Sequence, residues 1–94
     1  MVYDMIKKLR EEAGYSQAQL AKKLDVTRSS VNAWEMGLST PTTHYVVALA
    51  KLFHVSTDYM LGLETEKKIS LEGYGKTEIE LVYKLLRYFD EQKK

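Results

Sequence analysis

The polar residues with the most chemistry to offer lie in one short run of the chain, between Val26 and Trp34. An arginine guanidinium donates hydrogen bonds in a planar fork, and an asparagine amide both donates and accepts. Both groups can therefore form paired hydrogen bonds with a flat partner, and neighbouring hydroxyl groups can add single bonds. The outward-facing set that results comprises Thr27, Arg28, Ser29, Asn32 and Ala33.

Other kinds of chemistry find little support in the sequence. The chain has no cysteine, which excludes disulfides, thiolate zinc sites and cysteine nucleophiles. His44 and His54 are ten residues apart, whereas a helical metal pair needs a spacing of three or four. A glycine-rich phosphate loop and a nucleophile–base set are both missing from the sequence. We therefore predict no metal, no cofactor and no enzymatic activity.

Composition places the chain among globular proteins. Its 94 residues suffice for one compact domain and a tail, and a hydrophobic content of 45% argues against intrinsic disorder. Charged residues interrupt the apolar ones throughout residues 1–13, so we expect no signal peptide and a cytoplasmic location. The net charge is only +1, so any binding to nucleic acid must depend on a few well-placed side chains.

The elements that would position the polar set are helical. Apolar residues recur at three- and four-residue steps, as in Val2, Met5, Ile6 and Leu9, and proline occurs once. The fold class predicted is all-α. The expected helices span residues 2–13, 16–24, 28–36, 43–54, 56–62 and 77–92.

Capping residues mark where these helices begin. Ser16 with Gln19 forms a capping box, Thr27 is a good N-cap, and Thr77 with Glu80 is predicted to open the last helix. The domain organisation that follows has a five-helix domain at 1–62, a linker at 63–75 and a C-terminal helix at 76–94.

Two of the short helices, 16–24 and 28–36, are joined by a tight turn at Asp25 and Val26. Such a turn makes the helices cross steeply, so the second one projects from the domain. The crossing requires a small residue where the backbones approach, and Ala21 supplies it.

Residues 5–62 resemble the Cro/C1-type (XRE) helix-turn-helix family, with its phage-repressor (lambda-repressor-like) five-helix fold. The matching features are spaced through the run SQAQLAKKLDVTRSSVNAWEMG and the segment PTTHYVVALAKLFHVSTDYML that follows it after three residues. They are Gln17, Leu20, Ala21, Val26, Thr27, Trp34, Glu35, Gly37, Leu49, Ala50, Val55, Ser56 and Leu61.

The resemblance implies sequence-specific binding to double-stranded DNA by a transcriptional regulator, more often a repressor. Thr27, Arg28, Ser29 and Asn32 would then lie in the major groove, with Ala33 near a base edge or thymine methyl. Arginine pairs with guanine O6 and N7, and asparagine with adenine. The alternatives are a phosphate contact or solvent exposure for Arg28, and solvent exposure for Asn32.

The resemblance also implies supporting roles. Arg10 and Glu35 match a structural ion pair between the first and third helices. Asp25 replaces the usual glycine or asparagine of the turn, and Met36 replaces a residue that is often polar in relatives. The implied phosphate contacts are Gln17, Ser39, Thr40, Thr42 and Thr43.

The last helix carries a heptad-like apolar stripe made of Ile79, Val82, Leu86 and Phe89. We predict that this stripe joins two subunits into a homodimer that binds a palindromic operator. The alternatives are docking of the helix on its own domain, an antitoxin whose tail binds a toxin protein, and a protein-interaction module that no longer binds DNA.

Overall fold

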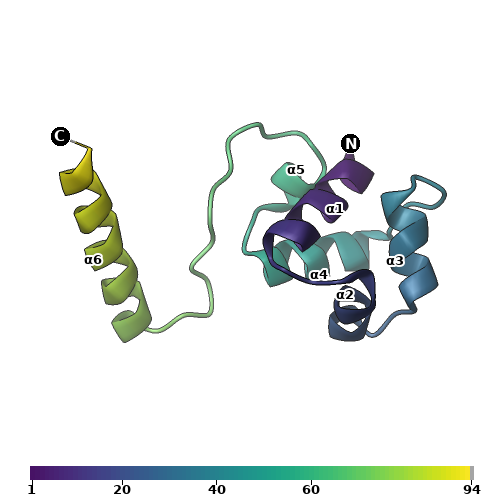
Figure 1. Ribbon diagram of the computed structural model, residues 1–94, viewed down its shortest axis with the longest axis horizontal. Helices are drawn as coiled ribbons and strands as arrows, with labels where there is room; N and C mark the ends of the chain where they lie inside the picture. The colour runs from purple at the N-terminus through teal and green to yellow at the C-terminus, as the bar shows by residue number, and fades with distance from the viewer. Residues whose placement is uncertain (94) are drawn as a thin grey trace.

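The computed structural model describes residues 1–93; Lys94, the last residue of the predicted C-terminal helix, lies outside the described residues. Within this range the chain forms six α-helices and no strand, as Figure 1 shows, so the all-α prediction is confirmed. The helices are α1 (Val2–Glu12), α2 (Gln17–Leu24), α3 (Arg28–Glu35), α4 (Thr43–Phe53), α5 (Thr57–Met60) and α6 (Lys76–Gln92).

Side-chain caps fix the starts of α2, α3 and α5. The hydroxyl of Ser16 accepts a hydrogen bond from the Gln19 backbone amide at 3.0 Å, and the Gln19 side chain accepts one from the Ser16 amide at 2.8 Å. Thr27 and Ser56 cap α3 and α5 in the same way, through their hydroxyl groups. The capping box predicted at Ser16 is therefore confirmed.

The turn between α2 and α3 depends on one residue in the left-handed conformation. Asp25 caps the C-terminus of α2 with φ 57° and ψ 46°, and the next amide, that of Val26, donates to the Ala21 carbonyl at 3.0 Å. Aspartate tolerates this region better than most residues because its short polar side chain can hydrogen-bond locally. The turn is thereby closed, and buried Ala21 lets the two helices approach.

One core holds α1 to α5 together. Its centre consists of side chains without solvent exposure. Trp34 packs against this centre from α3, and its ring centroid lies 5.5 Å from that of Tyr45. Because α3 is only eight residues long, Val31 and Trp34 anchor it and leave its other face outward. The fully buried side chains are Ile6, Leu20, Val31, Leu49 and Met60.

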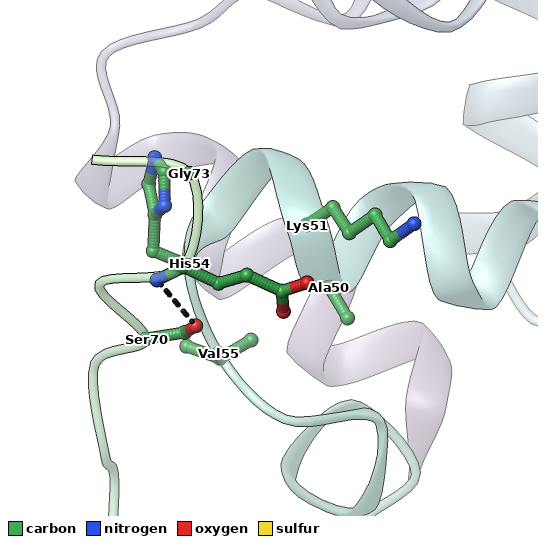
Figure 2. A pocket seen from close by; sticks show the side chains of 7 residues that line it. Ala50, Lys51, His54, Val55, Ser70 and Gly73 are labelled. Carbon is green, nitrogen blue, oxygen red and sulfur yellow. Dashed lines mark hydrogen bonds between the residues drawn. The ribbon is translucent and has the colours of Figure 1, made fainter. Parts of the chain in front are cut away.

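Residues 61–75, which we call the connecting segment, lie along the helical domain at several points. The Ser56 hydroxyl donates to Glu64 at 2.6 Å, and Lys67 pairs with Glu12 at 3.3 Å. At the end of α4, His54 accepts a backbone hydrogen bond from Ser70 at 2.8 Å. Figure 2 shows His54 and Ser70 beside a hollow of about 280 Å³ between α4 and the connecting segment; the dashed bond drawn there runs from the Glu72 amide to the Ser70 hydroxyl. The predicted linker is thus anchored to α1, α4 and the α5 cap.

The start of α6 differs from the prediction. The helix begins at Lys76 with Gly75 as its N-cap, and the Glu78 carboxylate accepts a hydrogen bond from the Gly75 amide at 3.2 Å. The predicted pair Thr77 and Glu80 is therefore wrong by two residues, because Glu78, two residues before Glu80, already satisfies the exposed backbone amide.

The placement of α6 leaves its apolar side uncovered. The helix stands apart from α1 to α5, at the opposite end of the 45 Å long axis from α3 (Figure 1). No residue between Lys76 and Gln92 is buried. In this structure α6 is not docked by its apolar side on α1 and α5.

The left-handed turn gives a first prediction. Replacing Asp25 with valine, a β-branched residue, should lower the free energy of unfolding by about 1–2 kcal/mol, whereas glycine at the same position should be tolerated. Urea denaturation of both variants measures the difference. Equal losses in the two variants would show that the aspartate side chain, and not the backbone conformation, matters here.

Candidate nucleic-acid interface

The outer face of α3 presents the predicted polar set to solvent. Thr27, Arg28, Ser29 and Asn32 are exposed, and Ala33 is half-buried at the edge of the face. Val31 and Trp34 hold the opposite side of the helix in the core. The structure thus brings these five residues together on one projecting surface at the N-terminus of α3, which we call the α3 face.

Thr27 has a structural duty as well as its exposed position. Its hydroxyl accepts from the Ser30 amide at 3.1 Å and lies 2.9 Å from the Ser30 hydroxyl. The oxygen is therefore largely committed to capping α3. What Thr27 offers an incoming ligand is mainly its methyl group, whereas the side chains of Arg28 and Ser29 are exposed along with it.

A chain of hydrogen bonds runs from α1 to the α3 face. Arg10 donates from Nε and Nη2 to the two carboxylate oxygens of Glu35, at 2.6 and 3.0 Å. Gln17 then donates from Nε2 to Glu35 Oε1 at 3.2 Å and to Asn32 Oδ1 at 3.1 Å. The Asn32 amide is thereby oriented by a neighbour that is itself held by a buried carboxylate.

Gln17 has two amide protons and gives both to these partners. Its remaining polar atom, Oε1, is an acceptor, and a phosphate offers only acceptor oxygens. A phosphate contact from the Gln17 side chain therefore requires that one of the two internal bonds be exchanged. This links the side chain predicted to contact phosphate directly to one predicted to contact a base.

The Arg10–Glu35 pair is nearly closed to solvent, with side-chain exposures of 12% and 4%. The hydrogen bond with Glu35 raises the pKa of Arg10, and burial partly opposes this. The contribution of the charged Arg10 to the stability of the fold is fully present below the unfolded-state pKa of its guanidinium. It is lost only as pH rises through the higher folded-state pKa. Arg10 therefore stays charged, and its contribution stays constant, around neutral pH.

The remaining residues predicted to contact phosphate lie between α3 and α4. Pro41 is buried and fixes this loop to the domain, while the four side chains around it are exposed. Thr42 is the N-cap of α4, but its side chain makes no capping hydrogen bond, so its hydroxyl is free of that duty. The exposed set comprises Ser39, Thr40, Thr42 and Thr43.

Two apolar side chains share this loop with the polar ones. Met36 and Leu38 are 66% and 77% exposed. A methionine side chain cannot donate a hydrogen bond to phosphate. The phosphate-contacting potential of the loop therefore rests on its hydroxyl and amide groups.

The stripe predicted to join two subunits lies far from the α3 face, on α6. Leu86 and Phe89 are about half exposed, and Ile79 and Val82 are partly covered at the start of the helix. The structure places these four residues along one side of a single helix, and more apolar residues of α6 widen that side.

Among residues 1–93 no group of three His, Asp or Glu side chains could hold a metal ion. His44 packs edge-on against Tyr45, and the His54 ring lies 3.0 Å from the Tyr74 hydroxyl. Over the same residues, each helix is too short or too polar to span a lipid bilayer.

Sequence reasoning missed the bonds that Gln17 makes to Asn32 and Glu35, and it missed the anchors of the connecting segment. The fold supplies the first by bringing the start of α2 beside the second turn of α3. The only signal in the sequence was that Gln17 opens one short helix and Glu35 lies in the next.

These features define a helix-turn-helix domain with a projecting, polar second helix. The helix-turn-helix family HTH_3 matches residues 6–60. The chain belongs to this family of Cro/C1-type (XRE) transcriptional regulators, as the resemblance predicted. The family is one of DNA-binding regulators and not of enzymes.

Similar proteins agree with this assignment. The transcriptional regulator ImmR of Bacillus subtilis is 35% identical over 81 residues, which cover 85% of this chain and 64% of ImmR. The P22 c2 repressor in complex with a synthetic operator is 26% identical, with a TM-score of 0.63 over 68% of this chain and 97% of that one. The predicted phage-repressor fold is thereby confirmed.

A second structural neighbour extends the comparison to α6. The complex of SinR and SinI gives a TM-score of 0.62 at 25% identity, covering 99% of this chain and 95% of the matched chain.

This chain spans less than two-thirds of the length of ImmR.

The buried ion pair gives a second prediction. Arg10→Ala should lower the free energy of unfolding by about 3 kcal/mol, because it leaves the Glu35 carboxylate without its cation. Thermal and urea denaturation measure the loss. Lys8→Ala, which removes an exposed cation from the same helix, should change stability by less than about 0.5 kcal/mol. Similar effects of the two substitutions would contradict a structural role for the Arg10–Glu35 pair.

Proposed function

We propose that this chain binds double-stranded DNA sequence-specifically and regulates transcription, mainly as a repressor that occupies its operator. The observation that carries the proposal is the α3 face, a projecting helix surface with exposed side chains of the kinds that read bases. On this face, hydrogen bonds hold Asn32 to Gln17, Gln17 to Glu35, and Glu35 to Arg10. An interface ordered before binding loses less side-chain freedom on binding.

In the proposed complex the α3 face enters the major groove. Arg28 is exposed and can donate two hydrogen bonds to guanine O6 and N7. Asn32 has its Oδ1 directed to Gln17 and keeps both Nδ2 protons, so it can donate to adenine N7 while Oδ1 also accepts from N6. Ser29 adds a single bond, and Thr27 and Ala33 offer methyl groups to a thymine methyl.

Contacts with the DNA backbone come from uncharged groups. Gln17 would exchange one internal hydrogen bond for a phosphate oxygen, and hydroxyls and amides of the loop before α4 would bind further phosphates. Because few cations take part, affinity should fall less steeply with salt than for a strongly basic protein. The proposed loop contacts are Ser39, Thr40, Thr42 and Thr43.

We also propose that α6 joins two copies through Ile79, Val82, Leu86 and Phe89. A half-exposed apolar stripe of this kind is typical of an interface. Since α6 and the α3 face lie at opposite ends of the molecule, pairing through α6 leaves both α3 faces free. Two-fold pairing matches a palindromic operator whose half-sites lie roughly 34 Å apart.

One observation favours a protein partner as the alternative occupant of α6. The SinR–SinI neighbour is a complex of two proteins, and the structural similarity covers nearly all of this chain. An antitoxin whose tail binds a toxin is one form of this alternative. Copurification of a second small protein from the native host would support it.

The first experiment is selection of bound sequences from random duplex DNA at physiological salt, with the wild type and Arg28→Ala. We expect a palindromic consensus from the wild type. In the variant the preference at one guanine in each half-site should weaken, because a bidentate pair discriminates by about 1–3 kcal/mol.

Lys51→Ala is the matched control, since it also removes one exposed cation but lies outside the α3 face. It should preserve the consensus. The proposal is wrong if the wild type enriches no sequence, and the role of Arg28 is wrong if Lys51→Ala and Arg28→Ala alter the consensus equally.

A further inference from the structure

We infer that two copies of α6 pair antiparallel, so that the aromatic end of each helix lies beside an apolar hollow at the start of the other. This inference rests on the proposed dimer. It adds the relative direction of the two α6 helices and a second contact surface, the apolar hollow. The evidence is the spacing of the stripe, the charges beside it and the position of the hollow.

The spacing of the stripe is the same in both directions. Ile79, Val82, Leu86 and Phe89 follow one another at steps of three, four and three residues. In an antiparallel pair, Ile79 therefore meets the partner's Phe89 and Val82 meets the partner's Leu86. In a parallel pair each residue would meet its own counterpart. The stripe alone permits both arrangements.

The residues that flank the stripe distinguish the two directions. With Ile79 and Leu86 at heptad position a, positions e are Lys76, Tyr83 and Asp90, and positions g are Glu78, Leu85 and Gln92. In antiparallel helices e faces e and g faces g. Lys76 then pairs with the partner's Asp90, and Leu85 packs on the partner's Leu85.

A parallel pair brings g opposite e of the other helix. Leu85 would then face the partner's Asp90, and a carboxylate would lose water against a leucine without gaining a cation. That arrangement is unfavourable because burying an unpaired charge is costly. Charge complementarity thus favours the antiparallel pair.

The apolar hollow, which is not the one drawn in Figure 2, lies where the aromatic end of the second copy would be placed. It has a volume of about 310 Å³ and lies between the connecting segment and the first turns of α6. Its walls are mostly apolar and include Ile69, Leu71, Tyr74, Leu81 and Val82.

Antiparallel register brings the partner's Tyr88 and Phe89 alongside the first turns of α6 at Ile79, next to the hollow that Leu81 and Val82 line. In a parallel pair the two aromatic ends would meet each other and the hollow would stay open. A helix of 17 residues is only about 25 Å long, so a contact beyond the stripe helps the interface approach the area of a stable dimer.

The chain contains no cysteine, so single cysteines can report the direction. Ile79→Cys and Phe89→Cys are prepared in the full chain and oxidised separately and as a mixture of differently tagged copies. A disulfide needs Cα atoms within about 7 Å. In the antiparallel pair, two copies of residue 79 lie about 15 Å apart along the axis, whereas residue 79 lies beside the partner's 89.

We expect disulfide dimers only in the mixture. Dimers from each variant alone would show a parallel pair and overturn the inference while leaving the proposed dimer intact. Light scattering measures the oligomeric state of the wild type in the same buffer. If the wild type is a dimer but no sample forms a disulfide, the interface lies outside α6. If the wild type is a monomer at all concentrations, the proposed dimer is wrong. Neither outcome affects the loss of guanine preference expected for Arg28→Ala in the DNA selection, which tests the α3 face separately.

A charge exchange gives a second readout that does not depend on oxidation. Lys76→Asp and Asp90→Lys should each raise the dimer dissociation constant by about three- to tenfold, and the double variant should restore it. Additive losses in the double variant would contradict the Lys76–Asp90 contact and with it the antiparallel direction.

Discussion

The carboxylate of Glu35 is the group on which the arrangement of the first three helices depends. It is almost fully buried on α3, where an ionised group is stable only if it is paired and hydrogen-bonded. Arg10 of α1 satisfies it with two bonds, and Gln17 of α2 adds a third. One buried charge thereby fixes three helices relative to one another, and through Gln17 it also orients Asn32 on the α3 face.

The two ends of the molecule have different physical characters. At one end, short helices with side-chain caps and a shared core hold a polar surface rigidly. At the other, α6 has an apolar side that nothing within residues 1–93 buries. The connecting segment between them is attached to α1, α4 and the α5 cap, so the start of α6 is set close to His54. This arrangement suits a protein that reads DNA with one end and associates through the other.

The sequence predicted the helices well because local signals determine them: apolar periodicity, the Ser16 and Thr27 caps, and Asp25 at a left-handed turn. It also predicted which residues share the α3 face, since Val31 and Trp34 must point inward. It missed what depends on tertiary approach. The amide of Gln17 could be assigned to Asn32 and Glu35 only once α2 and α3 were placed side by side, and Glu78 displaced Glu80 as the cap of α6 because Gly75 begins the helix.

Dimethyl sulfate protection on the selected operator shows whether the α3 face reads bases in the major groove. This reagent methylates guanine N7 in the major groove and adenine N3 in the minor groove. We expect the bound protein to shield guanine N7 in each half-site and to leave adenine N3 there reactive. Shielded adenine N3 with fully reactive guanine N7 would contradict this expectation.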